Sequence, residues 1–392
     1  MKNIGILEYH YHAIYLYTLA RVCKTNKTTV TIFTTKKIFS LIEPHLSHKE
    51  DYTIILKEDH ESINHFLKRV QTYCNEHIDL LFVNTIQETL KDLPHFLTFQ
   101  TRCPMILTIH DANTWLKPTI TIDLRKPIRT LDTILSTILI KKMILDKYAA
   151  INVVYPLIKD YITQHTTYTK PVFTIPFNFY DPPEQPLQHH KDTSKVTFLV
   201  PGEIIRARRD HSVVLDAFEE LFPQYPKNIS LIILGRPVGR YGKSIIKRCT
   251  ALHQHHYDIT WFTEFVPEKT YIETYQTADV IIAPIQLETH GLGTIRETFG
   301  QTKASGAPYE AIQYAKPIIL PQAFNLIPEL STSTITYQTA EDLKQKITDL
   351  LKTPHMLSDL KSNAVLNAQK FSLSCLQRYF EDNLLNNKEV SW

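Results

Sequence analysis

The stretch Gly291–Pro321, GLGTIRETFGQTKASGAPYEAIQYAKPIILP, indicates the fold more directly than any other part of the chain. The protein has 9 glycines in 392 residues, and four of them lie in the first half of this stretch: Gly291, Gly293, Gly300 and Gly306. Such clustering indicates a backbone that needs positive φ angles or close approach. Tyr309–Tyr314 then predicts a helix, which Lys316-Pro317 ends, and Ile318–Leu320 predicts a buried strand. A glycine-bearing loop before a helix N-terminus is a typical anion-binding arrangement.

Alternating strands and helices extend from this stretch in both directions. In the second half, apolar runs predict strands at Val196–Val200, Ile229–Leu234, Ile259–Phe262 and Val280–Pro284. Helical periodicity predicts helices at Ser212–Phe222, Ile245–His253, Glu268–Gln276, Glu341–Leu351, His355–Lys370 and Ser374–Leu385. In the first half, strands are predicted at Lys2–Leu7, Thr28–Thr34, Asp79–Asn84, Met105–Ile109, Ala150–Val154 and Val172–Ile175. Helices are predicted there at Ala13–Cys23, His60–Cys74 and Leu131–Tyr148. This alternation is typical of α/β proteins with parallel sheets.

A break in composition separates the two halves. Tyr180–Lys195, YDPPEQPLQHHKDTSK, holds three prolines and few large apolar residues, as interdomain linkers do. We therefore expect a first domain at 1–180, a linker at 181–195, a second domain at 196–370 and a C-terminal helix at 371–392 that packs back on the first domain. Two doubly wound domains place ligands beyond the carboxyl ends of their strands, so the expected site is the cleft between them.

Composition excludes several classes of function. The hydrophobic fraction of 43% and the charged fraction of 21% are those of a soluble globular protein. The 43 basic residues barely exceed the 40 acidic ones, which argues against nucleic acid as the main partner. The five cysteines lie far apart with no CxxC, so neither a zinc site nor a disulfide framework is expected, and a cytoplasmic location fits best.

The sequence contains no signal peptide and no membrane-spanning run. Glu8, His10 and His12 interrupt the apolar N-terminal segment. The longest apolar run, Ile134–Leu145, is broken by two lysines and falls short of the ~18 residues of a span. It is either packed on its own domain or an amphipathic helix in peripheral contact with the inner face of a membrane.

A basic turn after the strand Val196–Val200 is the first candidate site. Pro201-Gly202 leads into Arg206, Arg208, Arg209 and Asp210. Arginine suits phosphate because its planar guanidinium donates paired hydrogen bonds. The alternative is a solvated basic turn, but its position at the carboxyl end of a strand favours a functional one.

The second candidate is the loop and helix start within the opening stretch. Backbone amides around Thr302, Lys303, Ser305 and Gly306 are suited to wrap a diphosphate, and Lys303 adds positive charge. Glu310, one turn inside the helix, is placed to accept hydrogen bonds from sugar hydroxyls. The alternative for Glu310 is an acid that interacts favourably with the helix dipole.

Two further candidates lie in the first domain. His110-Asp111 follows the strand Met105–Ile109, so it is expected either in the ligand crevice or as a capping aspartate beside a core histidine. Glu8, His10 and His12 follow the first strand. In an extended segment His10 and His12 share a face, but no third metal ligand has suitable spacing. We therefore expect these three residues to bind an acceptor and predict no metal site.

Motifs of several well-characterised enzyme classes are absent from the sequence. It contains no GxGxxG after a strand, no GxxxxGK[ST], no GxSxG and no DxD. These absences argue against a nicotinamide-binding Rossmann site, a P-loop nucleotidase, a serine hydrolase and a DxD metal site.

In its sequence the chain resembles the retaining GT-B glycosyltransferases of family four. Four segments carry the resemblance, in the family's order: VPGEIIRARRDHSVVLDAF (Val200–Phe218), ISLIILG (Ile229–Gly235), ITWFTEFVPEKTYIETYQTADVIIAP (Ile259–Pro284) and TKASGAPYEAIQYAKPIILP (Thr302–Pro321). MILTIHD (Met105–Asp111) is similar to the family's strand ending in His-Asp. The resemblance implies a GT-B fold of two Rossmann-like domains. It implies a nucleotide-diphosphate sugar, UDP- or GDP-linked, held mainly by the second domain and an acceptor held by the first, with no metal or other cofactor.

The resemblance also implies roles for individual residues. Arg209 matches the basic residue that holds the donor diphosphate, and Glu310 matches the glutamate that contacts the ribose. Other residues matched to donor-binding positions are Gly202, Glu203, Arg208, Gly235, Thr263, Glu264, Phe265 and Val266, the last four around the base. His110 is expected to orient the sugar. His110, Arg209, Lys303 and Glu310 are therefore the predicted catalytic residues.

This sequence departs from the family at several of these positions. Glu203 stands where the family has arginine, and Thr302-Lys303-Ala304-Ser305 replaces a segment that begins with glutamate. We expect Lys303 to take over a phosphate contact and Glu297 to approach the sugar. The predicted function is retaining transfer of a hexose to a glycan, a lipid-linked or another hydroxyl acceptor, as in polysaccharide biosynthesis. The alternatives are a catalytically silent GT-B binding or scaffold subunit and a GT-B sugar-nucleotide epimerase.

Overall fold

A computed structural model describes residues 1–46, 48–87, 89, 91–117, 140–182, 195–290 and 295–386. The chain divides into two compact units. Unit 1 comprises Met1–Phe179, His290–Ala304 and Leu373–Trp392, and unit 2 comprises Tyr180–Thr289 and Ser305–Ser372. Gly291, Gly293, most of the predicted linker and residues 131–139 of a predicted helix lie outside the described residues.

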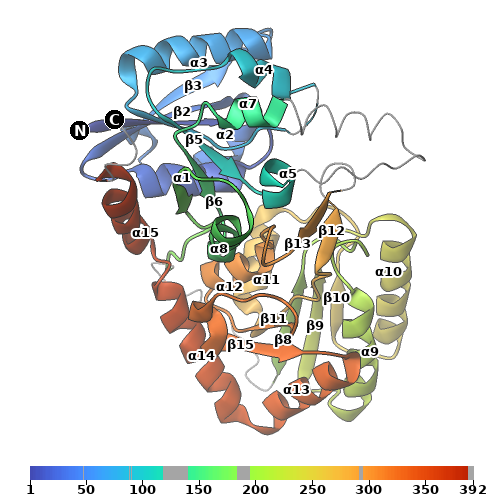
Figure 1. The fold of residues 1–392 in the computed structure, drawn as a ribbon. Coiled ribbons are helices and arrows are strands. Elements are labelled where there is room, and N and C mark those ends of the chain that lie inside the picture. The colour runs from blue at the N-terminus through green and yellow to red at the C-terminus, as the bar shows by residue number, and fades with distance from the viewer. Residues whose placement is uncertain are drawn as a thin grey trace. The chain divides into compact units, whose positions relative to one another are not determined.

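Unit 1 is built on a parallel sheet of seven strands in the order β3-β2-β1-β4-β5-β6-β7 (Figure 1). Its strands are β1 (Lys2–Glu8), β2 (Thr28–Thr35), β3 (Tyr52–Lys57), β4 (Leu80–Val83), β5 (Met105–Ile109), β6 (Ala150–Val153) and β7 (Val172–Thr174). Every residue of β4 and β5 is buried, as expected for central strands of a sheet covered on both faces. The described helices of this unit are α1 (Ala13–Cys23), α2 (Lys36–Ile42), α3 (Ile63–His77), α4 (Leu93–Thr98), α5 (Ala112–Leu116), α7 (Lys142–Leu145), α8 (Pro156–His165) and α15 (Leu373–Phe380).

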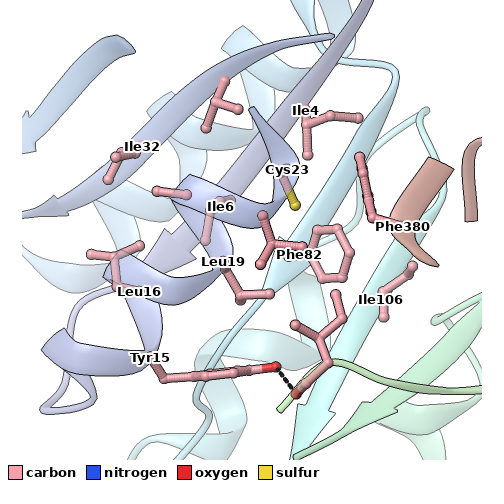
Figure 2. Close-up of a cluster of buried hydrophobic side chains, with 14 of the residues drawn as sticks. Ile4, Ile6, Tyr15, Leu16, Leu19, Cys23, Ile32, Phe82, Ile106 and Phe380 are labelled. Atoms are coloured by element: carbon pink, nitrogen blue, oxygen red, sulfur yellow. Dashed lines mark hydrogen bonds between the residues drawn. The ribbon is translucent and has the colours of Figure 1, made fainter. Parts of the chain in front are cut away.

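Helix α1 and the C-terminal helix α15 close one side of the unit 1 core. Figure 2 shows Leu16 and Leu19 of α1 beside Ile6 of β1, with Phe380 of α15 next to Phe82 of β4. The amide of Gln377 on α15 donates to the carbonyls of Arg21 and Lys24 at 3.1 and 2.6 Å. The last described residues therefore complete a core that begins at the N-terminus.

Unit 2 is built on a parallel sheet of six strands in the order β10-β9-β8-β11-β14-β15. Its strands are β8 (Val196–Pro201), β9 (Ile229–Leu234), β10 (Ile259–Trp261), β11 (Val280–Ile282), β14 (Ile318–Pro321) and β15 (Thr334–Tyr337). Its helices are α9 (His211–Gln224), α10 (Gly239–Gln254), α11 (Glu268–Thr277), α12 (Gly306–Gln313), α13 (Ala340–Lys352) and α14 (Pro354–Gln369). Two short strands, β12 (Glu288–His290) and β13 (Arg296–Thr298), lie where the chain passes from unit 2 to unit 1.

The direction of chain progression reverses once within each sheet. In unit 1 the reversal lies between β1 and β4, and in unit 2 it lies between β8 and β11. The carboxyl ends of such neighbouring strands leave room for a ligand, because the connections that follow them diverge. These two positions are therefore where site residues are expected.

Candidate functional site

Polar side chains gather at the reversal point of the unit 1 sheet. Glu8 ends β1, Asn84 and Thr85 follow β4, and His110 and Asp111 follow β5. Since β1, β4 and β5 are adjacent and parallel, all of these residues lie at one edge of the sheet. The sequence predicted Glu8, His110 and Asp111, whereas it gave no indication of a role for Thr85.

The Glu8 carboxylate is fully buried and saturated with hydrogen-bond donors. Its Oε1 accepts from the backbone amide of His10 at 2.7 Å. Its Oε2 accepts from the Asn84 amide at 2.8 Å and from the Thr85 hydroxyl at 2.5 Å. Burial raises the pKa of Glu8, and the hydrogen bonds from Thr85 and His10 act in the opposite direction. Glu8 is thus an internal anchor of this edge and not a group open to a ligand.

Two histidine rings lie against each other beside this anchor. The ring centroids of His12 and His110 are 4.1 Å apart, and His12 Nδ1 lies 2.7 Å from the Thr85 hydroxyl oxygen. Burial and the neighbouring His110 lower the pKa of His12 to about 2. Burial and the Lys303 ammonium lower the pKa of His110 to about 4. Both rings are therefore neutral at physiological pH.

His10 does not join this pair. We expected His10 and His12 to share a face, but β1 ends at Glu8 and the chain bends before α1 begins, so the alternation of an extended strand is lost. His10 Nε2 lies 3.0 Å from Asp92 Oδ2, and the Tyr9 hydroxyl donates to Asp92 Oδ1 at 3.0 Å.

The segment Ile295–Ala304 contributes a cation and a buried acid to unit 1. The Lys303 ammonium pairs with Asp111, and the backbones of these two residues form an antiparallel bridge. Glu297 is fully buried, and its Oε1 accepts from the amide and the hydroxyl of Thr114, both at 2.7 Å. Burial and the neighbouring Asp111 raise the pKa of Glu297. Glu297 therefore acts as a cap for α5 in this structure.

The polar groups of Thr302 are likewise used in hydrogen bonds within unit 1. Its hydroxyl accepts from the Thr298 amide at 2.7 Å, and its carbonyl accepts from the Ala112 amide at 2.9 Å. We expected Glu297 and Thr302–Ala304 to bind the donor with the second domain. The structure places all of them in unit 1.

A cavity of about 220 Å³ opens beside His110 and Asp111. Its walls combine polar and aromatic side chains, namely Tyr11, Thr85, Ile86, Gln87, Thr89, Thr108, His110, Asp111 and Trp115. His110 Nε2 is buried and has no hydrogen-bond partner among the described residues. A cavity with hydroxyl, amide, imidazole and aromatic walls suits a small polar ligand.

In unit 2, a cationic cradle is built from Gly202, Arg209 and Gly235. Gly202 follows β8 with a φ of 92°, and a Cβ on it would lie 2.5 Å from Arg209 Cζ. A Cβ on Gly235, which follows β9, would lie 2.1 Å from the Gly202 carbonyl oxygen. The absence of both side chains lets the Arg209 guanidinium lie directly on the backbone after β8.

The basic turn is anchored at the reversal point of the unit 2 sheet. The Asp210 amide donates to the Pro284 carbonyl at 2.8 Å, and the Gln286 amide donates to the Arg208 carbonyl at 2.9 Å. These bonds join the turn after β8 to the segment after β11. Half-buried Arg209 has an Nε without a hydrogen-bond partner among the described residues. At least one N–H of its guanidinium is therefore left without an acceptor in the described part of the chain.

The other charged residues of the turn have different neighbours. Arg206 pairs with Asp210 at 2.5 Å, and Asp210 also accepts from the Ser212 amide to cap α9. Glu203 pairs with Arg236 at 2.7 Å. Arg208 is exposed. Of the predicted arginines, Arg209 has the geometry best suited to a bound phosphate.

Helix α12 carries the remaining predicted donor residues. The Ser305 side chain makes no capping hydrogen bond to this helix. Gly306 is exposed, whereas Ala307 is buried and Pro308 has no amide proton, so the exposed amide at the start of α12 is that of Gly306. Glu310 Oε1 accepts from the Tyr271 hydroxyl at 2.6 Å, while Glu310 Oε2 has no partner among the described residues. Tyr271, on α11, was not predicted from the sequence because a lone tyrosine carries no motif.

The segment predicted to bracket a base follows β10. Thr263, Glu264 and Phe265 are exposed, with Phe265 82% accessible, and Val266 is buried. An aromatic side chain this exposed offers a stacking surface for a planar ring.

The described part of the chain has neither a metal-binding cluster nor a helix able to span a membrane. No cluster of three or more His, Cys, Asp or Glu side chains there is arranged to hold a metal ion. None of the helices formed by those residues has the length and apolar character needed to cross a membrane.

Comparison with solved structures identifies the fold. No protein-family model matches the chain, and no curated protein matches it either. HepE of Anabaena, solved in complex with UDP and glucose, is 14% identical with a TM-score of 0.63, and the match covers 99% of this chain and 100% of HepE. A UDP-forming trehalose-phosphate synthase from Burkholderia xenovorans is 11% identical with a TM-score of 0.57, covering 98% and 99% of the two chains. A UDP-N-acetylglucosamine 2-epimerase is 12% identical with a TM-score of 0.56, covering 98% and 95%.

These matches and the two parallel sheets show that the chain has a two-domain, Rossmann-like GT-B fold. The expected fold class is thereby confirmed.

Proposed function

We propose that this protein is a glycosyltransferase that moves a hexose from a nucleotide-diphosphate sugar to a hydroxyl acceptor. The main support for this proposal is the full-length structural match to a protein solved with UDP and glucose. The Arg209 cradle supports the proposal, because it places a cation at the reversal point of unit 2, where GT-B and other doubly wound sheets receive ligands.

In this proposal unit 2 binds the nucleotide. Arg209 and the exposed Gly306 amide at the start of α12 hold the diphosphate, Glu310 Oε2 accepts from ribose hydroxyls, and Phe265 stacks on the base. Negative charge grows on the diphosphate as the glycosidic bond breaks. Fixed positive groups around it therefore stabilise the transition state more than the ground state. Lys303 was expected to share this role, but its pairing with Asp111 leaves Arg209 as the principal phosphate contact.

Unit 1 binds the sugar that carries the acceptor hydroxyl, in the cavity beside His110. We further propose that transfer retains the anomeric configuration and needs no metal ion. Proton NMR of the first-formed product reads the configuration directly. Undiminished transfer in excess chelator tests the metal requirement.

The decisive experiment measures nucleotide binding and turnover with paired arginine variants. A thermal-shift panel of UDP, GDP and their sugars identifies the donor, because a ligand at 100 times its Kd stabilises the folded state by about 2.7 kcal/mol. Arg209→Ala should then lower kcat for transfer at least tenfold. Arg240→Ala, which removes an exposed arginine on α10, is the matched control. Equal kcat and KM for Arg209→Ala and the native protein would exclude the proposed role of Arg209.

A sugar-nucleotide epimerase is the second candidate, favoured by the match to a UDP-N-acetylglucosamine 2-epimerase over 98% of this chain and 95% of that one. An epimerase converts its sugar nucleotide without an acceptor, so analysis of products in acceptor-free reactions separates the two activities.

A binding or scaffold subunit is the third candidate. It is favoured by the engagement of Glu297 and Thr302 in structural hydrogen bonds within unit 1. Nucleotide-sugar binding without any hydrolysis, transfer or epimerisation would identify this case.

A further inference from the structure

The hydrogen-bond chain from Glu8 to His12 in unit 1 has a defined direction. Its middle member, the Thr85 hydroxyl, has one proton to donate. That hydroxyl lies 2.5 Å from Glu8 Oε2 and 2.7 Å from His12 Nδ1. An ionised carboxylate only accepts, so the Thr85 proton goes to Glu8. The Thr85 oxygen then accepts, and His12 Nδ1 must carry the proton that it donates.

The other donors around Glu8 support its ionised state. The His10 backbone amide donates to Oε1 at 2.7 Å, and a backbone amide cannot reverse its role. The Asn84 side chain donates to the same Oε2 as Thr85, at 2.8 Å. The His10 amide and the Asn84 NH₂ can only donate, and the ionised carboxylate is the form that accepts all three hydrogen bonds at once. Hydrogen bonds to the charged form favour that form.

A neutral imidazole with a proton on Nδ1 has a lone pair on Nε2. His110 also has a lone pair on Nε2, but a different hydrogen bond fixes its tautomer. It is hydrogen-bonded to the backbone of Asn84, and its Nε2 is buried with no partner among the described residues. Two imidazoles, with ring centroids 4.1 Å apart and planes tilted by 38°, therefore present acceptor nitrogens at one end of the sheet.

We propose that Glu8, acting through Thr85, fixes His12 in the Nδ1–H tautomer, so that His12 and His110 together present two hydrogen-bond acceptors to the hydroxyls of a sugar. Glu8 and Thr85 are positioning residues, because neither is proposed to touch the sugar through its carboxylate or hydroxyl. His12 serves as an acceptor and not as a base.

The surroundings complement a hydroxyl group. A hydroxyl both donates and accepts, and the Lys303 ammonium, held at Asp111, lies close enough to lower the pKa of both rings. His110 lines a 220 Å³ cavity together with Tyr11 and Trp115, and His12 lies against His110. Two acceptors with a donor nearby match a sugar ring with several hydroxyls. The ligand class rests on the proposed function, whereas the tautomer rests on the hydrogen bonds alone.

The tautomer is tested on the full, ligand-free chain by two-bond proton–nitrogen NMR of 15N-labelled histidines. The His12 signals are assigned by their loss in His12→Gln. The expected native spectrum shows His12 protonated on Nδ1. Thr85→Ser, which keeps the hydroxyl, should leave that spectrum unchanged. Thr85→Val, which keeps the size and removes the hydroxyl, should abolish the fixed Nδ1–H state.

Glu8→Gln makes a sharper prediction. Its amide oxygen can keep the His10 hydrogen bond, and its NH₂ then faces Thr85. The Thr85 proton must turn to His12, which should switch to the Nε2–H tautomer. A native His12 in the Nε2–H form, or an unchanged His12 in both Glu8→Gln and Thr85→Val, would overturn the positioning role. If Glu8→Gln does not fold, the Thr85 pair decides the question.

The ligand class is tested separately with D-glucose as the probe. Titration should shift the His12 and His110 Nε2 signals of the native protein. Affinity should fall about tenfold in Thr85→Val, the loss of one hydrogen bond, and recover in Thr85→Ser. Equal glucose affinity in all three proteins overturns the sugar-binding role of the tautomer. Loss of UDP binding in unit 2 would instead count against the proposed function, whatever the tautomer.

Discussion

Replacing Gly202 with alanine should disable nucleotide binding while leaving unit 2 folded. The new Cβ would lie 2.5 to 2.7 Å from the three outer carbon and nitrogen atoms of the Arg209 guanidinium. Those atoms end a flexible side chain, so Arg209 moves aside more readily than the backbone. A displaced guanidinium loses its hydrogen bonds to the diphosphate, worth about 1.5–3 kcal/mol. We expect Kd for UDP to rise about 10- to 150-fold.

The matched control is Gly239→Ala on α10. Gly239 also has a positive φ, 64°, but nothing lies within 4 Å of a Cβ placed there. Both substitutions carry the same kind of backbone penalty, about 1–2 kcal/mol, partly offset by a less flexible unfolded chain. Urea unfolding should therefore show similar small losses of stability in the two variants. Calorimetry with UDP should show weakened binding in Gly202→Ala alone.

A double-mutant cycle with Arg209→Ala tests the reason for the effect. If Gly202→Ala acts by moving Arg209, the double variant should bind UDP no more weakly than Arg209→Ala does by itself. The coupling energy would then equal the single effect in size. Additive losses would show that Gly202 acts through the backbone and would refute the cradle as described.

Three further outcomes follow from buried groups elsewhere. The pKa of the His110 imidazole is near 6.5 in the unfolded chain and about 4 in the folded one. The free energy of unfolding should therefore be highest above pH 6.5 and fall by about 3 kcal/mol as the pH drops to 4. Urea titrations should find this pH dependence reduced in His110→Asn. Glu297→Ala removes the acceptor of the Thr114 amide and hydroxyl and should cost about 2 kcal/mol or more of unfolding free energy. Glu297→Gln should lose less. Equal losses of unfolding free energy in the two variants would count against a capping role of Glu297. Phe380→Ala should cost about 3–5 kcal/mol, against under about 0.5 kcal/mol for exposed Leu366→Ala, in the same urea assay.

Apolar periodicity predicted most of the described strands because most are buried on both faces. Met105–Ile109 and Ile229–Leu234 were placed to the residue. Two edge strands, β3 and β15, were missed because they are only partly buried and their apolar residues are bordered by polar or charged ones. Helix α10 begins six residues before the predicted Ile245, since its first turns expose Arg240 and carry no apolar stripe.

Candidate site residues were identifiable from the sequence where a histidine or a charged residue follows a predicted strand. Arg209 and His110 belong to this class. Thr85 and Tyr271 were not, because their significance comes from partners 77 and 39 residues away, Glu8 and Glu310. Glu297 was assigned to the donor sugar and Lys303 to a donor phosphate because both lie, in sequence, at or near the segment that resembles the family's donor-binding loop. Sequence distance is a poor guide there, because the chain passes from unit 1 to unit 2 between Ala304 and Ser305.

The order in which the units are completed during synthesis follows from this threading. Unit 1 needs His290–Ala304 and Leu373–Trp392 in addition to its first 179 residues, whereas unit 2 is finished at Ser372. A ribosome therefore releases all of unit 2 before it releases Leu376 and Phe380, which seal the unit 1 core. Unit 1 is synthesised first, but part of its apolar sheet face stays uncovered until α15 has been made. A nascent chain stalled before Leu373 should thus be protease-sensitive in unit 1 and protected in unit 2.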